Sequence, residues 1–222
     1  MGTSTGGEAF GGILEPWYLS LEDPAGSQEK TLLSLIDGYA RTQYGVEHHA
    51  DEVVGFEGYR ENIPKLDYQS LKAYLEPVKR GSYDSFLSEP PEAWVMTRGS
   101  TGRSKILPAT RTHLQQIFGC GARAFVNHLL RDSELIRGRV LNLSLPSRVA
   151  TIKVEDGSIG YGYSSGTYSR LFPSLGDAVL VPRQEEVDGL GPGLTKRDWE
   201  RRFELVYQHA LGREIAAAMG VA

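Results

Sequence analysis

The sequence predicts a mixed α/β fold in which a helical N-terminal portion is followed by β-strands with flanking helices. Two observations predict it. Up to residue 90 the apolar residues recur three and four positions apart, which is the spacing of one helix face. From residue 91 onward, β-type apolar runs alternate with longer helical patterns, as in α/β folds. We therefore expect a disordered tail at 1–15, a helical portion at 16–90 and an α/β portion at 91–222.

Two helices stand out in the helical portion. The first is predicted at 28–42, with Ser27 as its N-cap and apolar residues at helical spacing. Asp67 is predicted to cap the second, whose apolar face includes Leu75. The glycine-, serine- and proline-rich stretch 81–91 then reads as a connector to the α/β portion.

The α/β portion is predicted to contain buried strands, two long helices and two glycine-rich loops. The strands are expected at 93–97, 140–145, 151–154 and 179–181. One helix is expected from residue 110 or 112 to about 131, and a second from a capping box of Thr195 and Asp198, with further helical turns to Gly220. The loops are expected at 160–168 and 185–193.

Composition and charge exclude several classes of protein. The formal net charge of −4 is modest, which argues against a general nucleic-acid binder or a protein of the membrane surface. No apolar run is long enough for a membrane span, and the start lacks the pattern of a signal peptide. The single cysteine, Cys120, permits no internal disulfide and falls in a helical apolar pattern, so we expect a buried thiol. A cytoplasmic location is the expectation.

The stretch with the most chemical content follows the strand at 93–97. It reads Thr97-Arg98-Gly99-Ser100-Thr101-Gly102-Arg103-Ser104-Lys105. Its glycines permit positive φ and close approach to a ligand, successive amides can bind an anion, and its hydroxyls and lysine suit phosphate oxygens. The Walker pattern does not match, because only two residues separate the glycines and the lysine comes three positions later. A phosphate-binding loop and a polar hairpin turn are the two interpretations.

Three segments upstream of this loop are informative when they are considered together with it. They are Gln28-Glu29-Lys30-Thr31-Leu32-Leu33, Thr42-Gln43-Tyr44-Gly45 and Ile63-Pro64-Lys65-Leu66-Asp67-Tyr68. The loop resembles the phosphate loop of the acyl-adenylate-forming superfamily. Together with the upstream segments it is most similar to the acyl acid amido synthetases that conjugate plant hormones to amino acids, and to their bacterial relatives. Phenylacetate–coenzyme A ligases are a more distant match.

The resemblance implies the N-terminal part of an adenylate-forming large domain. It implies ATP and Mg²⁺ as cofactors, a small-molecule carboxylic acid as substrate, and an amine or a thiol as acceptor. In that scheme the phosphates are held by Thr97, Arg98, Gly99, Ser100, Thr101, Gly102 and Lys105. Arg98 departs from the pattern, since the family usually has Ser or Gly at this position.

The chain ends at Ala222, whereas family members continue well beyond the corresponding point. The later nucleotide motifs of the family have no match here. This leaves a second interpretation, in which the chain is a catalytically incomplete fragment or split subunit that acts as a binding or interaction module. Its partner would then be the missing C-terminal part, supplied as a separate chain.

A second glycine-, serine- and tyrosine-rich segment at 160–168 is a candidate for lining an acyl or nucleotide pocket. The tyrosines offer flat apolar walls with polar tips. The candidate residues are Tyr161, Tyr163, Ser164 and Ser165. A surface turn is the alternative.

The sequence suggests neither a catalytic side chain nor a metal site. Adjacent His48 and His49 cannot both face one metal ion from a helix, and no third ligand has a useful spacing. No Ser-His-Asp or Cys-His arrangement is evident. The resemblance implies that catalysis rests on positioning and electrostatic stabilisation more than on a covalent nucleophile.

Overall fold

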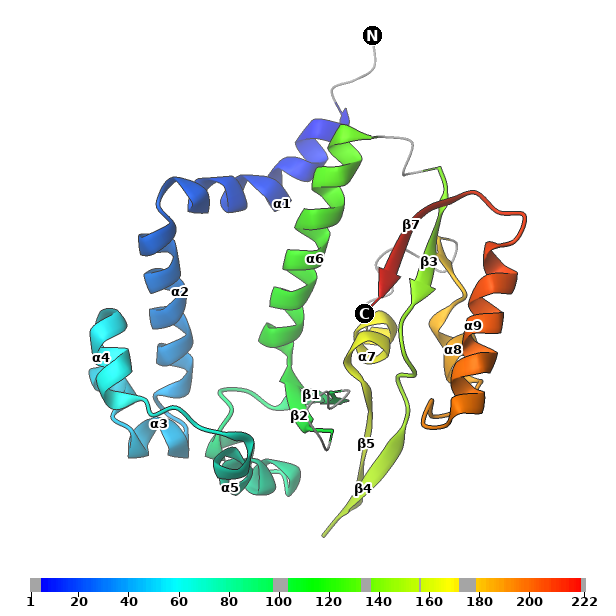
Figure 1. The fold of residues 1–222 in the computed structure, drawn as a ribbon. Coiled ribbons are helices and arrows are strands. Elements are labelled where there is room, and N and C mark those ends of the chain that lie inside the picture. Colours follow the sequence, from blue (N-terminus) through cyan, green and yellow to red (C-terminus); the bar gives the residue numbers. More distant parts are fainter. Residues whose placement is uncertain (1–4, 98–103, 133–136, 156, 172–178, 221–222) are drawn as a thin grey trace. The chain divides into compact units, whose positions relative to one another are not determined.

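The computed structural model describes residues 5–97, 104–132, 137–155, 157–171 and 179–220 (Figure 1). The chain forms two compact units. One, here called the helical unit, consists of Met1–Pro91 and Thr110–Asn127. The other, here called the sheet unit, consists of Glu92–Ala109 and His128–Ala222. The mixed α/β class predicted from the sequence is confirmed.

The helical unit is built from short helices and part of one long helix. In chain order these are α1 (Thr5–Glu22), α2 (Pro24–Tyr39), α3 (Gln43–Glu47), the 3-10 turn η1 (Ala50–Glu52), α4 (Gly55–Asn62), α5 (Tyr68–Lys79), the 3-10 turn η2 (Tyr83–Ser85) and the first part of α6 (Arg111–Arg131). The predicted cap of α5 is confirmed, because the Asp67 carboxylate accepts a hydrogen bond from the Ser70 amide at 2.8 Å.

Helix α2 begins earlier than predicted. Asp23 caps it by accepting a hydrogen bond from the Gly26 amide at 3.0 Å, so Ser27 lies inside the helix. Pro24 occupies the first turn, where its missing N–H costs nothing. The pair of Asp23 and Pro24 was thus the stronger start signal.

Helix α1 occupies much of the region where the sequence predicted a disordered tail. Its second half is held by contacts with α6, more than a hundred residues along the chain. The Tyr18 hydroxyl donates a hydrogen bond to Asn127 Oδ1 at 2.6 Å, and the Arg123 guanidinium lies 5.6 Å from the centre of the Trp17 ring. Such long-range contacts leave no local pattern, which is why the sequence did not reveal this helix.

Two clusters of side chains contribute to the core in the described part of the helical unit. One contains the buried residues Ile36, Ala50 and Val53, packed with Leu32, Ala40 and Ile63. The other is aromatic: the Tyr44 ring meets the Tyr74 ring edge-on at 5.0 Å and the Phe86 ring at 5.3 Å. Edge-to-face pairs of this kind are favourable beyond the area they bury.

The sheet unit contains two sheets. A four-stranded sheet has the order β2-β1-β5-β4, made of β1 (Pro91–Met96), β2 (Ile106–Thr110), β4 (Ala150–Val154) and β5 (Gly157–Tyr163). In it β1 and β5 are parallel, while β4 and β5 form an antiparallel hairpin. A parallel three-stranded sheet has the order β6-β3-β7, made of β3 (Arg139–Leu143), β6 (Leu180–Val181) and β7 (Ile215–Gly220).

Three helices accompany the strands: α7 (Ser164–Leu171), α8 (Gln184–Asp188) and α9 (Lys196–Ala210). The predicted capping box of α9 is confirmed, with the Asp198 amide donating to Thr195 Oγ1 at 3.2 Å and the Thr195 amide donating to Asp198 Oδ2 at 3.1 Å. The core is formed by Met96, Leu145 and Tyr163, with Ile106, Val149, Tyr161 and Trp199 packed against it.

Three predictions for the sheet unit are wrong. The segment 160–168 is the end of β5 and the start of α7 rather than a loop. The segment 185–193 contains most of α8. The chain before Gly220 forms β7 instead of helical turns, because pairing with β3 overrides the helix propensity of its three alanines.

Cys120 is exposed, which corrects the expectation of a buried thiol. Leu114 and Val126 are the buried residues of α6. At 3.6 residues per turn, Cys120 points away from the face that these two define. Gly119 and Gly121 beside it touch nothing within 4 Å of where a Cβ would be, so this stretch of α6 is open to solvent.

Candidate functional site

The two segments singled out in the sequence come together at one end of the four-stranded sheet. Strands β1 and β5 are neighbours and run parallel, with Met96 opposite Tyr163. Thr97 and Ser164 therefore follow the last residues of adjacent strands at the same carboxyl edge. Ligands of α/β proteins bind outside the carboxyl ends of the strands, so this edge is the candidate site.

Hydrogen bonds close the base of the glycine-rich loop. The Thr97 amide donates to the Lys105 carbonyl oxygen at 2.9 Å, and the Lys105 amide donates to Thr97 Oγ1 at 3.1 Å. Lys105 is exposed and Thr97 is half-buried. Arg98, Gly99, Ser100, Thr101 and Gly102 lie outside the residues that the structure describes. The described ends of the loop thus place Lys105 beside the end of β1.

The second segment, 160–168, lies partly in the hydrophobic core and partly at the candidate edge of the sheet. Tyr163 is 8% exposed and belongs to the hydrophobic core, and Tyr161 packs against that core. A role of these tyrosines in lining a pocket stays a prediction. Ser164 and Ser165 are half-buried at the start of α7. The Ser165 hydroxyl accepts a hydrogen bond from the Leu145 amide at 3.1 Å. The two serines therefore lie at the candidate edge, with Ser165 anchoring the chain that follows β3.

The glycines of this segment allow backbones to meet closely. A Cβ on Gly162 would fall on the carbonyl group of Ser147, and a Cβ on Gly166 would fall on the carbonyl oxygen of Leu145. Their role is to let β5 and α7 lie against residues 145–147, a packing role that the sequence analysis did not anticipate.

A buried polar network behind the edge escaped the sequence analysis. The Asp188 carboxylate accepts hydrogen bonds from the Ser147 amide at 2.6 Å and the Ser147 hydroxyl at 2.5 Å. Gln184 Nε2 donates to the same carboxylate at 3.0 Å and to the Leu145 carbonyl oxygen at 3.2 Å. Arg170 Nε donates to the Ser147 hydroxyl at 3.1 Å. Apart from Gln184 and Asp188, which lie four residues apart in α8, these partners lie 23 to 41 residues apart where α7, α8 and the chain after β3 meet, so no local motif marks the network.

Arg202 on α9 holds the end of β3. Its Nη1 donates to the carbonyl oxygens of Leu143 at 2.8 Å and Ser144 at 2.9 Å. The guanidinium also lies 5.0 Å from the centre of the Trp199 ring. Because a guanidinium presents several donors in a plane, it can bind carbonyls along its edge while stacking on an aromatic ring.

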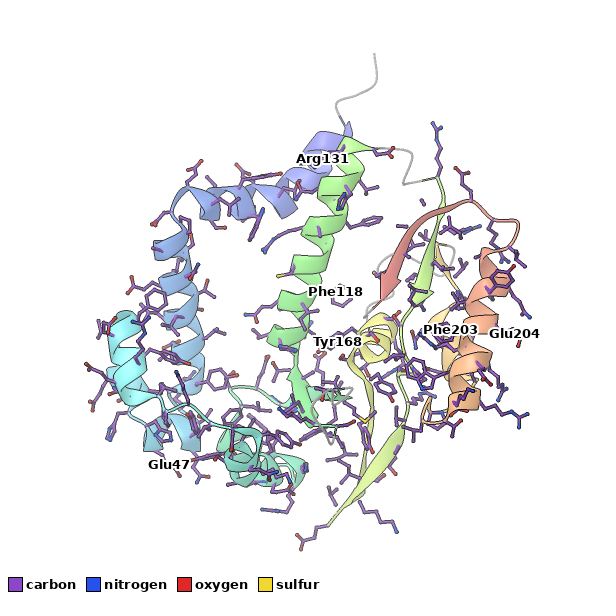
Figure 2. The ribbon with its side chains drawn as sticks, viewed as in Figure 1. Glu47, Phe118, Arg131, Tyr168, Phe203 and Glu204 are labelled. Atoms are coloured by element: carbon purple, nitrogen blue, oxygen red, sulfur yellow. The ribbon has the colours of Figure 1, made fainter. Side chains whose placement is uncertain are left out.

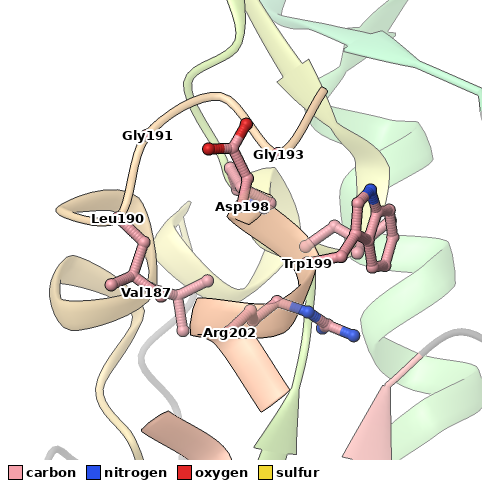
Figure 3. Close-up of a pocket in the computed structure, with 9 residues that line it drawn as sticks. Val187, Leu190, Gly191, Gly193, Asp198, Trp199 and Arg202 are labelled. Carbon is pink, nitrogen blue, oxygen red and sulfur yellow. The ribbon is translucent and has the colours of Figure 1, made fainter. Parts of the chain in front are cut away.

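A small hollow lies next to Arg202 (Figure 3). It encloses about 240 Å³ of space, part of it open to solvent. Its walls are mostly apolar, and its lining residues are Leu145, Pro146, Val187, Leu190, Gly191, Gly193, Asp198, Trp199 and Arg202. The closed part of the hollow measures only about 10 Å³, room for about one water molecule, so the hollow cannot enclose a nucleotide.

The described ranges contain neither a metal-binding cluster nor a membrane-spanning helix. No group of three or more His, Cys, Asp or Glu side chains within them is placed to hold a metal ion. None of the helices in those ranges has the length and apolar character needed to cross a membrane.

Comparison with protein families accounts for this arrangement. Residues 15–176 match the GH3 family N-terminal domain. The match covers most of the chain, from α1 through α7, and includes the glycine-rich loop and both strands that lead to the candidate edge. The chain belongs to the GH3 family.

Named relatives of this GH3 chain agree with the family match. A probable indole-3-acetic acid-amido synthetase, GH3.13 of Oryza sativa subsp. japonica, is 28% identical over 102 residues, which is 41% of this chain and 22% of the rice protein. The solved structure of the AtGH3.15 acyl acid amido synthetase in complex with 2,4-DB aligns with a TM-score of 0.58 at 17% identity, covering 69% of this chain and 26% of that one.

A second structure, of the GH3.15 acyl acid amido synthetase, aligns with a TM-score of 0.56 at 16% identity over 73% of this chain and 29% of that one. At these identities the structural likeness establishes the fold alone. This GH3 chain spans about a quarter of the length of the relatives it matches.

Proposed function

We propose that this GH3 protein takes part in ATP-dependent activation of a carboxylic acid and in transfer of the acyl group to an amine. The observation that carries the proposal is the position of the glycine-rich loop, which leaves a central strand at the carboxyl edge of a sheet in a GH3-type fold. Its named relatives are amido synthetases, which favours an amine over a thiol as acceptor.

The proposed reaction has two steps. First, a carboxylate oxygen of the acid attacks the α-phosphorus of ATP, the bond from that phosphorus to the bridging oxygen breaks, and pyrophosphate leaves. An amine then attacks the acyl carbon of the adenylate, loses a proton, and displaces AMP. Negative charge builds up on the phosphate oxygens in the first step, so electrostatic stabilisation and positioning are the main contributions a protein makes.

The chain's own residues have defined roles in this proposal. The amides around Gly99 and Gly102 and the hydroxyls of Ser100 and Thr101 would bind phosphate oxygens, and Lys105 would add a positive charge. Thr97 would hold the base of the loop through its hydroxyl. Mg²⁺ would arrive bound to the nucleotide phosphates.

The proposal is tested by pyrophosphate exchange into ATP with a panel of carboxylic acids. Lys105→Ala should weaken ATP binding by roughly 1–3 kcal/mol, the scale of a lost charged hydrogen bond. Lys153→Ala, which removes an exposed lysine from β4 of the same sheet, is the matched control and should leave ATP binding unchanged. Equal ATP affinity in the wild type and Lys105→Ala would remove the loop from the site.

A second candidate function is that of a binding module that does not complete the reaction alone. It is the alternative that the sequence analysis left open. In this case calorimetry should detect ATP binding by the chain while exchange is absent. Exchange by the isolated chain would exclude this candidate.

A further inference from the structure

One carboxylate joins the chain before the β1–β2 pair to the chain after it. Glu89 lies two residues before β1, and Thr112 is the second residue of α6, directly after β2. The Thr112 amide donates a hydrogen bond to Glu89 Oε1 at 2.7 Å. We call this contact the Glu89 clasp.

The opposite end of the strand pair is closed by the hydrogen bonds between Thr97 and Lys105 described above. Strands β1 and β2 are neighbours in the four-stranded sheet, so the pair is tied at both ends. A shift of β2 along β1 would have to break the Glu89 clasp or the Thr97–Lys105 contacts. The clasp therefore restrains where Lys105 lies relative to the end of β1.

Several groups around Glu89 favour its charged form. The hydrogen bond from the Thr112 amide lowers the pKa of Glu89 most, burial opposes it, and the hydroxyls of Thr112 and Thr110 and the charge of Arg111 lower it further. On the side of α2, burial and then the nearby Glu89 charge raise the pKa of Tyr39. The amides at the start of α6 add the positive end of a 21-residue helix, which also favours an anion.

The clasp is also close in the sequence to both points at which the chain passes between the two units. The chain passes from the helical unit to the sheet unit after Pro91 and returns after Ala109. Both crossings fall in the sequence between Glu89 and Thr112. One side-chain contact inside the helical unit thus joins the segment that leads into β1 to the segment that follows β2.

We propose that Glu89 is a positioning residue for Thr97 and Lys105, the described ends of the glycine-rich loop, and that it acts through the β1–β2 pair. Its effect on ATP rests on the proposed function, whereas its effect on the strand pair does not. Neither the carboxylate nor the clasp has to touch a ligand for this role.

The first test is spectroscopic and needs no activity. Glu89→Gln keeps the shape of the side chain but removes its charge, and Glu92→Gln, an exposed carboxyl three residues further on, is the matched control. In Glu89→Gln the amide resonances of Thr112, Thr97 and Lys105 should all shift, and amide exchange at Lys105 should become at least about threefold faster. Glu92→Gln should leave the Thr112 and Lys105 amides unchanged. A shift at Thr112 with no change at Thr97 and Lys105 would overturn the proposal.

The second test is kinetic and uses pyrophosphate exchange. In Glu89→Gln the KM for ATP should rise about three- to tenfold while kcat changes less, as expected when a coupled contact shifts a binding group. An active wild type with the same KM in Glu89→Gln contradicts the positioning role. If the wild-type protein shows no pyrophosphate exchange, the result counts against the proposed function instead. The amide spectra then decide whether Glu89 has the positioning role.

Discussion

The two units of this GH3 chain are stabilised in different ways. In the helical unit, side chains cap their own helices: Asp23, Thr42 and Asp67 each accept a hydrogen bond from an amide three residues ahead. In the sheet unit α9 has a local cap as well, but the polar network also joins residues about 40 positions apart, as between Ser147 and Asp188. Local caps are therefore more prominent in the helical unit, and close approach of distant backbones is more prominent in the sheet unit.

The largest effect is expected at a glycine of the sheet unit. In Gly162→Ala the new Cβ would meet the Ser147 carbonyl group, which is held in place because the Tyr163 amide donates to the Pro146 carbonyl oxygen at 3.0 Å. We expect a loss of about 3 kcal/mol or more in the free energy of unfolding, since rigid backbone blocks any relaxation. Urea denaturation followed by tryptophan fluorescence measures it.

The matched control is Gly58→Ala in α4 of the helical unit. There the nearest atoms are those of Val53 at 3.6 and 3.7 Å, an ordinary contact distance. Alanine is the better helix former, so this variant should gain up to about 1 kcal/mol. Equal losses in both variants would mean that the two units do not differ in their tolerance of side chains.

A smaller effect is expected from the polar network of the sheet unit. Asp188→Ala leaves the buried Ser147 amide without its acceptor, so it should cost about 2–3 kcal/mol of unfolding free energy. Glu185→Ala removes an exposed carboxylate from the same helix and should change stability by no more than about 0.5 kcal/mol. Urea denaturation of the two variants side by side tests this, and similar costs would show that the network contributes little.

The smallest effect is expected in the helical unit, at the hydrogen bond from the Tyr74 hydroxyl to Glu47 Oε2. Glu47 is labelled in Figure 2. This bond raises the pKa of Tyr74 to about 12. Because the folded pKa is raised, the contribution of Tyr74 to stability is fully present below about pH 10 and is lost as the pH rises through about 12.

Spectrophotometric titration of the tyrosines checks this prediction. In Glu47→Gln the pKa of Tyr74 should fall toward its ordinary value of about 10. Glu57→Gln, which alters an exposed carboxylate bonded to Arg60 in α4, should leave the Tyr74 titration unchanged. Titration of Tyr74 near its ordinary pKa in the wild type would contradict the hydrogen bond.

Local signals decided how much of the fold could be predicted. Asp67 and the Thr195–Asp198 box were readable because each cap and its partner lie within three residues. Strand β7 was missed because its alanines favour a helix in isolation, and only pairing with β3, more than 70 residues earlier, makes it a strand. Helix α1 was missed for the same reason, since its anchors lie on α6.

The candidate site, too, could be predicted only where its residues are contiguous in the sequence. Thr97 and Lys105 could be singled out because the loop chemistry is contiguous in the sequence. The sequence could not show that Ser164 starts at the same sheet edge, because that follows from the parallel pairing of β1 with β5. Glu89 and Asp188 were out of reach, since a carboxylate that binds a distant amide looks like any other surface carboxylate in the sequence.

Cys120 gives the chain a practical property. It is the sole thiol of the protein, it is exposed, and it lies on α6, the one helix of the described chain that contributes residues to both units. A maleimide fluorophore or spin label would therefore attach at a single point, without any cysteine having to be engineered. Adding nucleotide to such a labelled protein would test whether binding at the proposed site reaches this helix.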